Sequence, residues 1–423
     1  MKTRFRKDWQ YYKFCLYGFL KNQRFFEPFL LLIFLREKGL NYTQIGTLYA
    51  LRFILRMIFE VPSGVMADAM GRRGTMLFAY AFYMISFGGY YYATSFLWLI
   101  VPTVLFSMGD AFRTGTHKAM IFEYLKRNGW QDQKVAYYGH TRSWSQTGSA
   151  ISSLLASILV LFSKTYTIVF LYCLIPYTLG FILLASYPGY LESTTTSRSK
   201  KATTLIQIRN VIIDSVRAIK NLSNLKLIFN IASFSGLYDA AKDYLQIIIS
   251  MAVVSLPVYI HSHRAKNEKE IITIGLIYFI LYFLTAAASR NSGRMANIFK
   301  SGAKYLNFFM LAGIFTAIGA GVFYQVDLFI PAIALFLFIL IIENLRRPAG
   351  VSAVADQFSE DILASILSVE SQVSSVLAAI LSFLIGFLAD LLGPGYGLVA
   401  AALVLLIVFP FLKLKPIVKN RRK

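Results

Sequence analysis

The chain has 423 residues, of which 57% are hydrophobic and only 15% are charged. This composition excludes an ordinary soluble protein, because too few charged side chains remain to cover its surface. The formal net charge of +22 would suit a nucleic-acid-binding protein, but the basic residues lie between long apolar segments, so no nucleic-acid partner is expected. The two cysteines both fall in apolar segments, which excludes a disulfide framework and a cysteine-based metal site.

Apolar segments follow one another along the whole chain. A membrane-spanning helix needs about 20 mostly apolar residues, and about twelve segments meet this condition. They lie near 11–35, 42–66, 74–95, 97–120, 136–162, 166–187, 225–260, 271–288, 304–323, 328–346, 365–390 and 396–414. A transmembrane barrel would instead show strands of about 10 residues with alternating polarity. The sequence therefore predicts an all-α membrane protein with twelve transmembrane helices.

Basic residues are concentrated at both ends of the chain and in the even-numbered connections between segments. Examples are Arg72 and Arg73 after the second segment, Lys200 and Lys201 after the sixth, and Arg294 after the eighth. The positive-inside rule then places both termini and the 188–224 connection in the cytoplasm. We expect a multi-pass protein of the plasma membrane, the inner membrane of a bacterium, with its basic residues against anionic lipid.

Charged residues inside the first two segments are a strong functional signal. They are Lys21, Arg24 and Glu27 in the first segment, and Arg52, Arg56 and Glu60 in the second. A charge in the bilayer costs from about 3 to more than about 10 kcal/mol, so such side chains must face a cavity or one another. Pro28 directly follows Glu27 and removes a backbone donor, which predicts a bend beside a titratable group.

The second segment ends in Gly64-Val65-Met66-Ala67-Asp68-Ala69-Met70-Gly71-Arg72-Arg73. A turn with this many charges cannot lie in hydrocarbon, so it marks a membrane exit. The pattern resembles the signature loop of the major facilitator superfamily, a large family of secondary transporters. Further stretches resemble a bacterial group within it that is mostly of unassigned substrate: Phe25–Pro28, Glu60–Gly64, Thr114–Met120 and Gly139–Gln146.

The resemblance implies two pseudo-symmetric six-helix bundles around a central cavity that opens to either side in turn. It also implies a gate formed by Gly64, Asp68, Gly71, Arg72 and Arg73, in which Asp68 and Arg72 help to hold the cytoplasmic side closed. The second half departs from the pattern, because Arg290 stands where the acid of the loop would be.

The two halves of the chain look like diverged copies. Asp110 precedes Arg113 by one helical turn in segment 4, as Glu343 precedes Arg346 in segment 10. Repeats are usual in transporters. We expect an N-terminal six-helix bundle at 1–190, a cytoplasmic linker with an amphipathic helix at 191–224, and a C-terminal six-helix bundle at 225–423.

Cationic residues outnumber acids within the membrane segments of the first half, and acids outnumber cations in the second. The candidate substrate-binding residues are Lys21, Arg24, Arg52, Arg113, Lys242, Gln246 and Arg346. Because arginine binds carboxylate or phosphate through paired hydrogen bonds, they indicate a substrate with an anionic group. The alternative is that the charges pair internally, Arg113 with Asp110 and Arg346 with Glu343.

Proton coupling needs a carboxyl group whose protonation changes as its surroundings open and close. The candidates are Glu27, Asp239, Asp243, Asp110, Glu343 and Glu370. For Glu27 the alternative is a fixed salt bridge to Arg24 or Arg52. No nucleotide-binding loop, dinucleotide fingerprint or zinc-ligand spacing occurs in a fitting context, so neither an enzyme nor a cofactor or metal is expected.

The sequence therefore predicts a secondary active transporter, a symporter or antiporter that moves a small polar or anionic solute by alternating access. We expect protons as the coupling ion and a monomer in the bilayer. A drug/proton antiporter is the alternative, which the many charges inside the membrane disfavour. A non-transporting membrane sensor would not need those charges, and a channel would show filter-like repeats.

Overall fold

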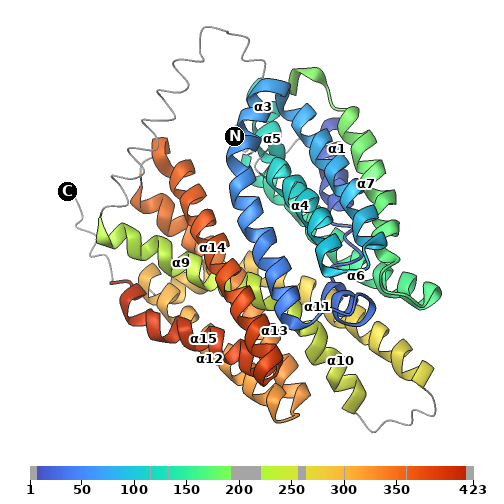
Figure 1. Ribbon diagram of the computed structural model, residues 1–423. Helices are drawn as coiled ribbons and strands as arrows, with labels where there is room; N and C mark the ends of the chain where they lie inside the picture. The colour runs from blue at the N-terminus through green and yellow to red at the C-terminus, as the bar shows by residue number, and fades with distance from the viewer. Residues whose placement is uncertain are drawn as a thin grey trace. The chain divides into compact units, whose positions relative to one another are not determined.

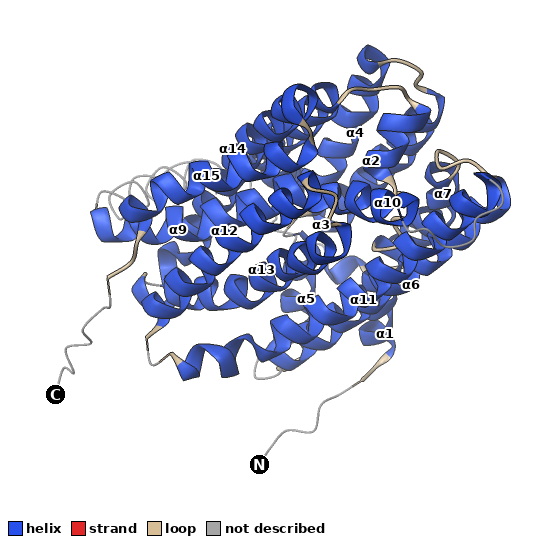
Figure 2. Cartoon of the chain, turned by 90° about the horizontal axis from the view of Figure 1, so that it is seen from below, coloured by secondary structure: helices blue, strands red, loops and turns tan. Residues whose placement is uncertain are grey.

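The computed structural model describes residues 7–114, 116–130, 134–191, 221–255, 263–299, 301–358 and 360–415. Helices make up almost all of this part of the chain, and none of it forms a strand (Figures 1 and 2). The helical class predicted from the sequence is therefore confirmed. The amphipathic helix expected in the linker, at 205–219, lies outside the described residues.

The contacts divide the chain into two compact units. The first contains α1 (Trp9–Lys21), α2 (Leu30–Leu32), the π-helical turn η1 (Ile33–Glu37), α3 (Tyr42–Tyr92), α4 (Phe96–Arg113), α5 (Thr116–Arg127), α6 (Lys134–Ser163), α7 (Val169–Ala185) and the 3-10 turn η3 (Gly189–Leu191). The second contains α9 (Leu222–Ala241), the 3-10 turn η5 (Lys242–Tyr244), α12 (Gly302–Gln325), α13 (Phe329–Gln357), α14 (Glu360–Leu392) and α15 (Pro394–Leu412). Two further helices, α10 (Leu245–Ser255) and α11 (His263–Ile298), contribute to both units.

Residues 249–283 group with the first unit rather than with their sequence neighbours. Specific contacts hold them there: Glu270 forms an ion pair with Arg36 at 2.8 Å, and the Ser157 hydroxyl donates to the Ile271 carbonyl at 2.9 Å. The contact units therefore differ from a single division at the linker. The boundaries 1–190, 191–224 and 225–423 stay a prediction about the two bundles.

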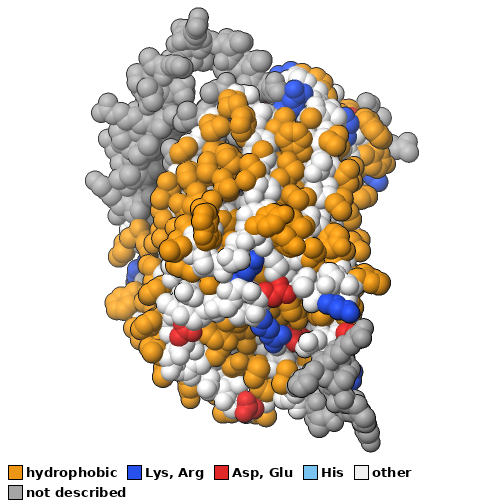
Figure 3. Space-filling view, turned by 45° about the vertical axis from the view of Figure 1, so that its right-hand side comes forward, with side chains coloured by type: hydrophobic (Ala, Val, Ile, Leu, Met, Phe, Trp, Pro, Cys, Tyr) orange, Lys and Arg blue, Asp and Glu red, His pale blue; other side chains and the backbone are white. Residues whose placement is uncertain are grey.

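Seven helices of the described part are long and apolar enough to cross a membrane. On the face shown in Figure 3, hydrophobic side chains cover most of the described surface. Some large apolar residues are strongly exposed, such as Phe162 at 85% and Phe283 at 71%. Such exposure is unfavourable in water but suits contact with lipid tails.

The first apolar segment is interrupted in the structure. α1 ends at Lys21, and regular helix resumes only at Leu30. Pro28 lacks a backbone N–H and disfavours helix at the residue before it, which explains the break. The Asn22 amide fixes the break against α6, because it donates to the Ser145 carbonyl at 2.6 Å. Arg24 and Glu27 consequently lie on an irregular stretch rather than on one face of a helix.

The second and third apolar segments form α3, which changes direction at Gly71. Gly71 has φ 81° and ψ 157°, a conformation that essentially only glycine adopts. The conformation at this corner of α3 therefore explains why the signature loop has a glycine at position 71.

Candidate functional site: a buried arginine–carboxylate cluster

Asp110 is the centre of a buried ion cluster in the first unit. Its carboxylate, whose side chain is 7% exposed, accepts hydrogen bonds from Arg24 at 3.0 Å and Arg52 at 3.2 Å. Arg113, one turn further along α4, reaches it at 3.4 Å, and the Tyr83 hydroxyl donates to it at 2.5 Å. Three guanidinium groups and one hydroxyl thus surround one carboxylate, with three of these donors on Oδ1 and one, from Arg52, on Oδ2.

Arg24 is held on several sides by protein groups. Its Nε donates to the Tyr177 hydroxyl at 3.0 Å, and its two terminal nitrogens reach Glu27 and Tyr83 at 3.3 and 3.2 Å. The side chain is 13% exposed. Because the helix is broken here, Arg24 can extend between α3, α4 and α7, where it organises the cluster.

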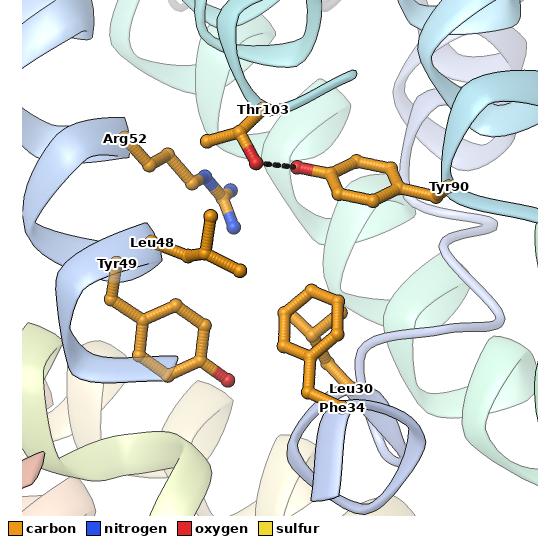
Figure 4. Close-up of a pocket in the computed structure, with 7 residues that line it drawn as sticks. All are labelled: Leu30, Phe34, Leu48, Tyr49, Arg52, Tyr90 and Thr103. Carbon is orange, nitrogen blue, oxygen red and sulfur yellow. Dashed lines mark hydrogen bonds between the residues drawn. The ribbon is translucent and has the colours of Figure 1, made fainter. Parts of the chain in front are cut away.

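Arg52 and Arg113 are more accessible than Arg24, with side chains 24% and 23% exposed. The Arg52 guanidinium also lies over the Phe106 ring, 4.3 Å from its centroid, a favourable cation–π arrangement. Figure 4 shows Arg52 at the edge of a small pocket, on the same side as Thr103, which forms a hydrogen bond of 3.0 Å with Tyr90. Leu30, Phe34, Leu48 and Tyr49 complete this pocket. A guanidinium paired on one side and accessible on another is suited to binding a further anion.

Lys21 lies at the end of α1, beside this cluster. Its side-chain nitrogen lies 5.9 Å from the centroid of the Tyr17 ring, and within the described residues it forms no ion pair. Arg113, Arg24 and Arg142 are the charged groups that act on it, so its neighbours are cations rather than a carboxylate.

Glu27 joins the cluster through Arg24. It accepts from Arg24, and the Tyr282 hydroxyl of α11 donates to its other oxygen at 3.1 Å. Its side chain is 35% exposed, the largest value among the cluster's carboxylates. The structure thus brings together five of the predicted site residues: Arg24, Glu27, Arg52, Asp110 and Arg113.

A second cluster lies in the second unit and is built differently. Arg347 donates to Glu370 at 2.6 Å and to the Ser235 hydroxyl at 3.2 Å. Ser235 in turn donates to Glu343 at 2.5 Å. Within the described residues, Oε2 of Glu343 has no hydrogen-bond partner although the side chain is buried. Glu343 is thus a buried carboxyl group with one hydroxyl donor and no salt bridge in this part of the chain.

Arg346 does not pair with Glu343 in the way that the sequence spacing indicated. It is 2% exposed and donates to the Asn230 carbonyl at 3.1 Å, the Asn230 side chain at 2.9 Å and the Leu306 carbonyl at 3.3 Å. These contacts fasten α13 to α9 and α12. The arrangement supports a packing role for Arg346, because its guanidinium is buried against backbone carbonyls.

The remaining candidates of the second unit lie around the turn η5. Lys242 and Asp239 form an ion pair at 3.2 Å across one turn, with the lysine side chain 40% exposed. Asp243 is half-buried in the same turn, and Gln246 is fully buried on α10. Asp239, at the end of α9, is among the charged groups that act on Glu343.

The signature loop is only partly described. Arg72 donates to the Ala119 carbonyl at 3.2 Å, and Arg73 donates to the Tyr187 carbonyl at 2.8 Å. The side chain of Asp68 lies outside the described residues, and so do the surroundings of Gly64. The arginines thus contact the ends of neighbouring helices, while the ion pair implied for Asp68 remains a prediction.

Three consecutive residues at the end of the first segment, Arg36, Glu37 and Lys38, each hold a different element. Arg36 forms an ion pair with Glu270 and donates a hydrogen bond to the Ser250 hydroxyl at 2.5 Å. Glu37 accepts hydrogen bonds from two backbone amides that lie just before the start of α7. Lys38 donates to the last carbonyls of α3 at 2.6 and 2.9 Å. Burial lowers the pKa of Lys38, and the charge of Glu37 opposes this shift.

Sequence reasoning missed several residues that complete these sites. Tyr83 and Tyr177 are neutral aromatics in a chain with 26 tyrosines, so nothing in their type marked them out. The Arg36–Glu270 pair was hidden because the two residues lie 234 positions apart. The one signal that could have indicated this pair is that both residues lie in connections expected on the non-cytoplasmic side of the membrane.

The family model of the Major Facilitator Superfamily matches residues 22–345. An uncharacterized MFS-type transporter, YxaM of Bacillus subtilis (strain 168), is 23% identical over 232 residues, which cover 52% of this chain. The match spans about half of that relative's length, 53%.

Solved transporter structures share the fold over nearly the whole chain. The nucleoside transporter NupG is similar at a TM-score of 0.70 and 12% identity, covering 95% of this chain and 96% of that one. A D-xylose-proton symporter gives a TM-score of 0.66 and 15% identity, with coverage of 96% and 99%. Identities this low relate the folds and carry no information on substrate.

Proposed function

Because the chain belongs to the major facilitator superfamily and is a multi-pass membrane protein with that fold, we propose that it moves a small polar solute with an anionic group by alternating access. Transport and the absence of enzymatic activity follow from the family. The nature of the solute and the coupling ion are the proposal.

The Asp110 cluster is the observation that supports an anionic solute. Arg52 and Arg113 are each paired with Asp110 yet remain about a quarter exposed, at 24% and 23%. A guanidinium has five donors in a planar fork, so each can bind a second acceptor without leaving the first. A hydrophobic cation would find like charges here instead.

Glu343 is the carboxyl group that we propose for proton coupling. Among the predicted candidates, Glu27, Asp110, Asp239 and Glu370 each lie in a described salt bridge, which stabilises the ionised form. Glu343 has only the Ser235 hydroxyl and an oxygen without a described partner. A carboxyl group buried in this way can gain and lose a proton as its surroundings change.

The expected membrane placement completes the proposal. The distribution of lysine and arginine supports a bacterial inner-membrane protein with both termini in the cytoplasm. We propose that one copy of the chain is the transporting unit, since the two units each supply a polar cluster.

Reconstitution into liposomes tests the anionic solute. Arg52→Gln should weaken the apparent affinity for the transported anion by about 10- to 100-fold, since a charge-assisted hydrogen bond contributes about 1.5–3 kcal/mol. Arg127→Gln is the matched control, because Arg127 is 42% exposed and pairs locally with Glu123. If the ligands that an unbiased screen selects are hydrophobic cations, the drug/proton antiporter replaces this proposal.

A pH gradient across the same liposomes tests the coupling site. Glu343→Gln should abolish accumulation against a gradient while solute exchange continues, because exchange needs no net proton movement. Accumulation that persists in this variant would move the coupling site elsewhere. Solute accumulation that depends on a sodium gradient and not on the pH gradient would contradict proton coupling itself.

A further inference from the structure

Arg347 of α13 lies between two buried carboxyl groups of the second unit. Its Nη1 donates to the Glu370 carboxylate of α14 at 2.6 Å, and the Glu370 side chain is only 2% exposed. The same nitrogen donates to the Ser235 hydroxyl at 3.2 Å, and that hydroxyl donates to Glu343 at 2.5 Å. A single hydroxyl group therefore separates the Arg347 guanidinium from its second carboxyl neighbour, Glu343.

The spacing along α13 gives Arg347 a direct route to Glu343. The two residues are four positions apart on one helix, and the acid is nearer the N-terminus, which is the favourable order for an ion pair within a helix. In the structure Arg347 contacts α14 instead, and its side chain is 37% exposed, so packing does not enclose it. A change of its side-chain torsion angles can therefore exchange Glu370 for Glu343 as its partner.

The other charged groups near these two carboxyl groups have partners of their own. The charged and titratable groups around the pair are Arg346 of α13, Asp239 of α9, Lys242 of η5 and Tyr305 of α12. Arg346 donates to backbone carbonyls of α9 and α12, and Lys242 forms an ion pair with Asp239. Arg346 thus acts alike whichever carboxyl group Arg347 contacts, and Arg347 is the cation that can change its partner.

Arg347 cannot serve both carboxyl groups equally at one time. A buried carboxylate without a hydrogen-bonded cation is costly, so the group that Arg347 leaves is favoured in its protonated form. In the structure Glu370 has the arginine, whereas Glu343 has a hydroxyl donor and no salt bridge among the described residues. The observed arrangement therefore fits an ionised Glu370 and a protonated Glu343.

From this geometry we infer that Glu343 and Glu370 compete for Arg347 and hold one transported proton between them. In the observed arrangement Arg347 bonds Glu370, and the proton is on Glu343. In the second arrangement Arg347 bonds an ionised Glu343, and the proton is on Glu370. One O–H bond breaks on Glu343 as one forms on Glu370, so the proton passes from α13 to α14 and the charge of the group is unchanged. The inference rests on the proposed function, because it adds Glu370, and Arg347 as a positioning residue, to the coupling site at Glu343.

Infrared spectroscopy of the whole protein in lipid vesicles tests the inference, because a protonated carboxyl group has a C=O stretching band that an ionised one lacks. At neutral pH, Glu343→Gln should lose the band of one carboxylic acid per chain, since Arg347 then holds Glu370 ionised. Glu370→Gln should lose a band of the same size, because Arg347 then turns to Glu343. Arg347→Gln should instead gain the band of one carboxylic acid, as neither group keeps its cation.

Matched variants and transport measurements complete the test. Glu123→Gln and Arg127→Gln break a local ion pair of the first unit and should leave the band unchanged. In liposomes with an imposed pH gradient, Glu370→Gln should abolish accumulation as fully as Glu343→Gln while solute exchange continues. If Arg347→Gln fails to fold, the two glutamine variants of the carboxyl groups decide, because they keep the shape of the side chain.

The other outcomes separate this inference from the proposed function. Loss of the band in Glu343→Gln but not in Glu370→Gln overturns the sharing and leaves Glu343 as the coupling site. Loss in Glu370→Gln alone overturns both the sharing and the coupling role of Glu343, because the proton would then belong to Glu370. No loss in either variant shows that the pair holds no proton, which also overturns both. A transported solute that is a hydrophobic cation, together with the expected bands, overturns the anionic solute and supports the shared proton.

Discussion

Asp110 shows how a single buried carboxylate can organise its neighbours. Three arginines and Tyr83 would each lose a charged acceptor if the charge of Asp110 were lost. Removing one side of a buried ion pair is far more damaging than removing an exposed pair, because the remaining charges stay desolvated. The same logic explains why an exposed pair such as Glu123 with Arg127 adds little.

Asp110→Asn should therefore destabilise the protein by about 3–5 kcal/mol, since it leaves buried guanidinium groups without their anion. Thermal unfolding in detergent measures this. Glu123→Gln is the control and should cost less than about 1 kcal/mol. Equal melting temperatures for Asp110→Asn and the wild type would show that the arginines pair elsewhere.

At Gly71 the backbone conformation, rather than any contact, requires a glycine. At φ 81° and ψ 157°, Gly71→Ala should cost about 1–3 kcal/mol, because this region is essentially closed to residues with a Cβ. Gly74→Ala, one turn further along α3, meets only an ordinary contact at 3.6 Å and should be neutral or stabilising. Similar melting temperatures for the two variants would rule out the strained corner.

At the scale of elements, the sequence predicted which segments are helical, and Pro28 predicted a bend in the first of them, but not how far the interruption extends. Hydrophobic runs of about 20 residues identify membrane helices because the bilayer core is about 30 Å thick. The helix already ends at Lys21, where the Asn22 amide donates to α6, a contact across 123 positions that no local pattern encodes. For the same reason the spacing of Asp110 and Arg113 predicted their ion pair, whereas Arg346 bonded to distant carbonyls instead of Glu343.

The packing of α1 on α6 gives a test at this scale. A Cβ on Gly148 would lie 2.7 Å from the carbonyl oxygen of Phe19, so Gly148→Ala must push the backbones apart. We expect a loss of about 1–3 kcal/mol, typical of overpacking. Gly139→Ala lies on the same helix with open space around it and should leave the melting temperature unchanged.

At the scale of the whole molecule, the two contact units do not follow a single division at the linker between the two halves. Residues 249–283 group with the first unit, and the Arg36–Glu270 pair is one contact that holds them. Glu270 is 3% exposed and Arg36 is 41% exposed, so the two partners respond unequally to substitution.

Arg36→Ala should destabilise the protein by about 3–5 kcal/mol, because it leaves the buried Glu270 carboxylate without its cationic partner. Glu270→Gln should cost less, since it leaves a neutral amide inside and a partly solvated guanidinium outside. Thermal unfolding ranks the two variants, and Glu268→Gln, at an exposed position of α11, serves as the control. The opposite ranking would mean that Arg36, not Glu270, is the desolvated partner.

The ion pairs at Asp110 have a kinetic consequence for the transport cycle. With no solute bound, Arg24, Arg52 and Arg113 still hold the Asp110 carboxylate. Under the proposed function the solute binds beside this carboxylate, so the empty carrier keeps part of its positive charge neutralised while it reorients. We therefore expect net transport rather than obligatory exchange, in which a carrier returns only when it is refilled.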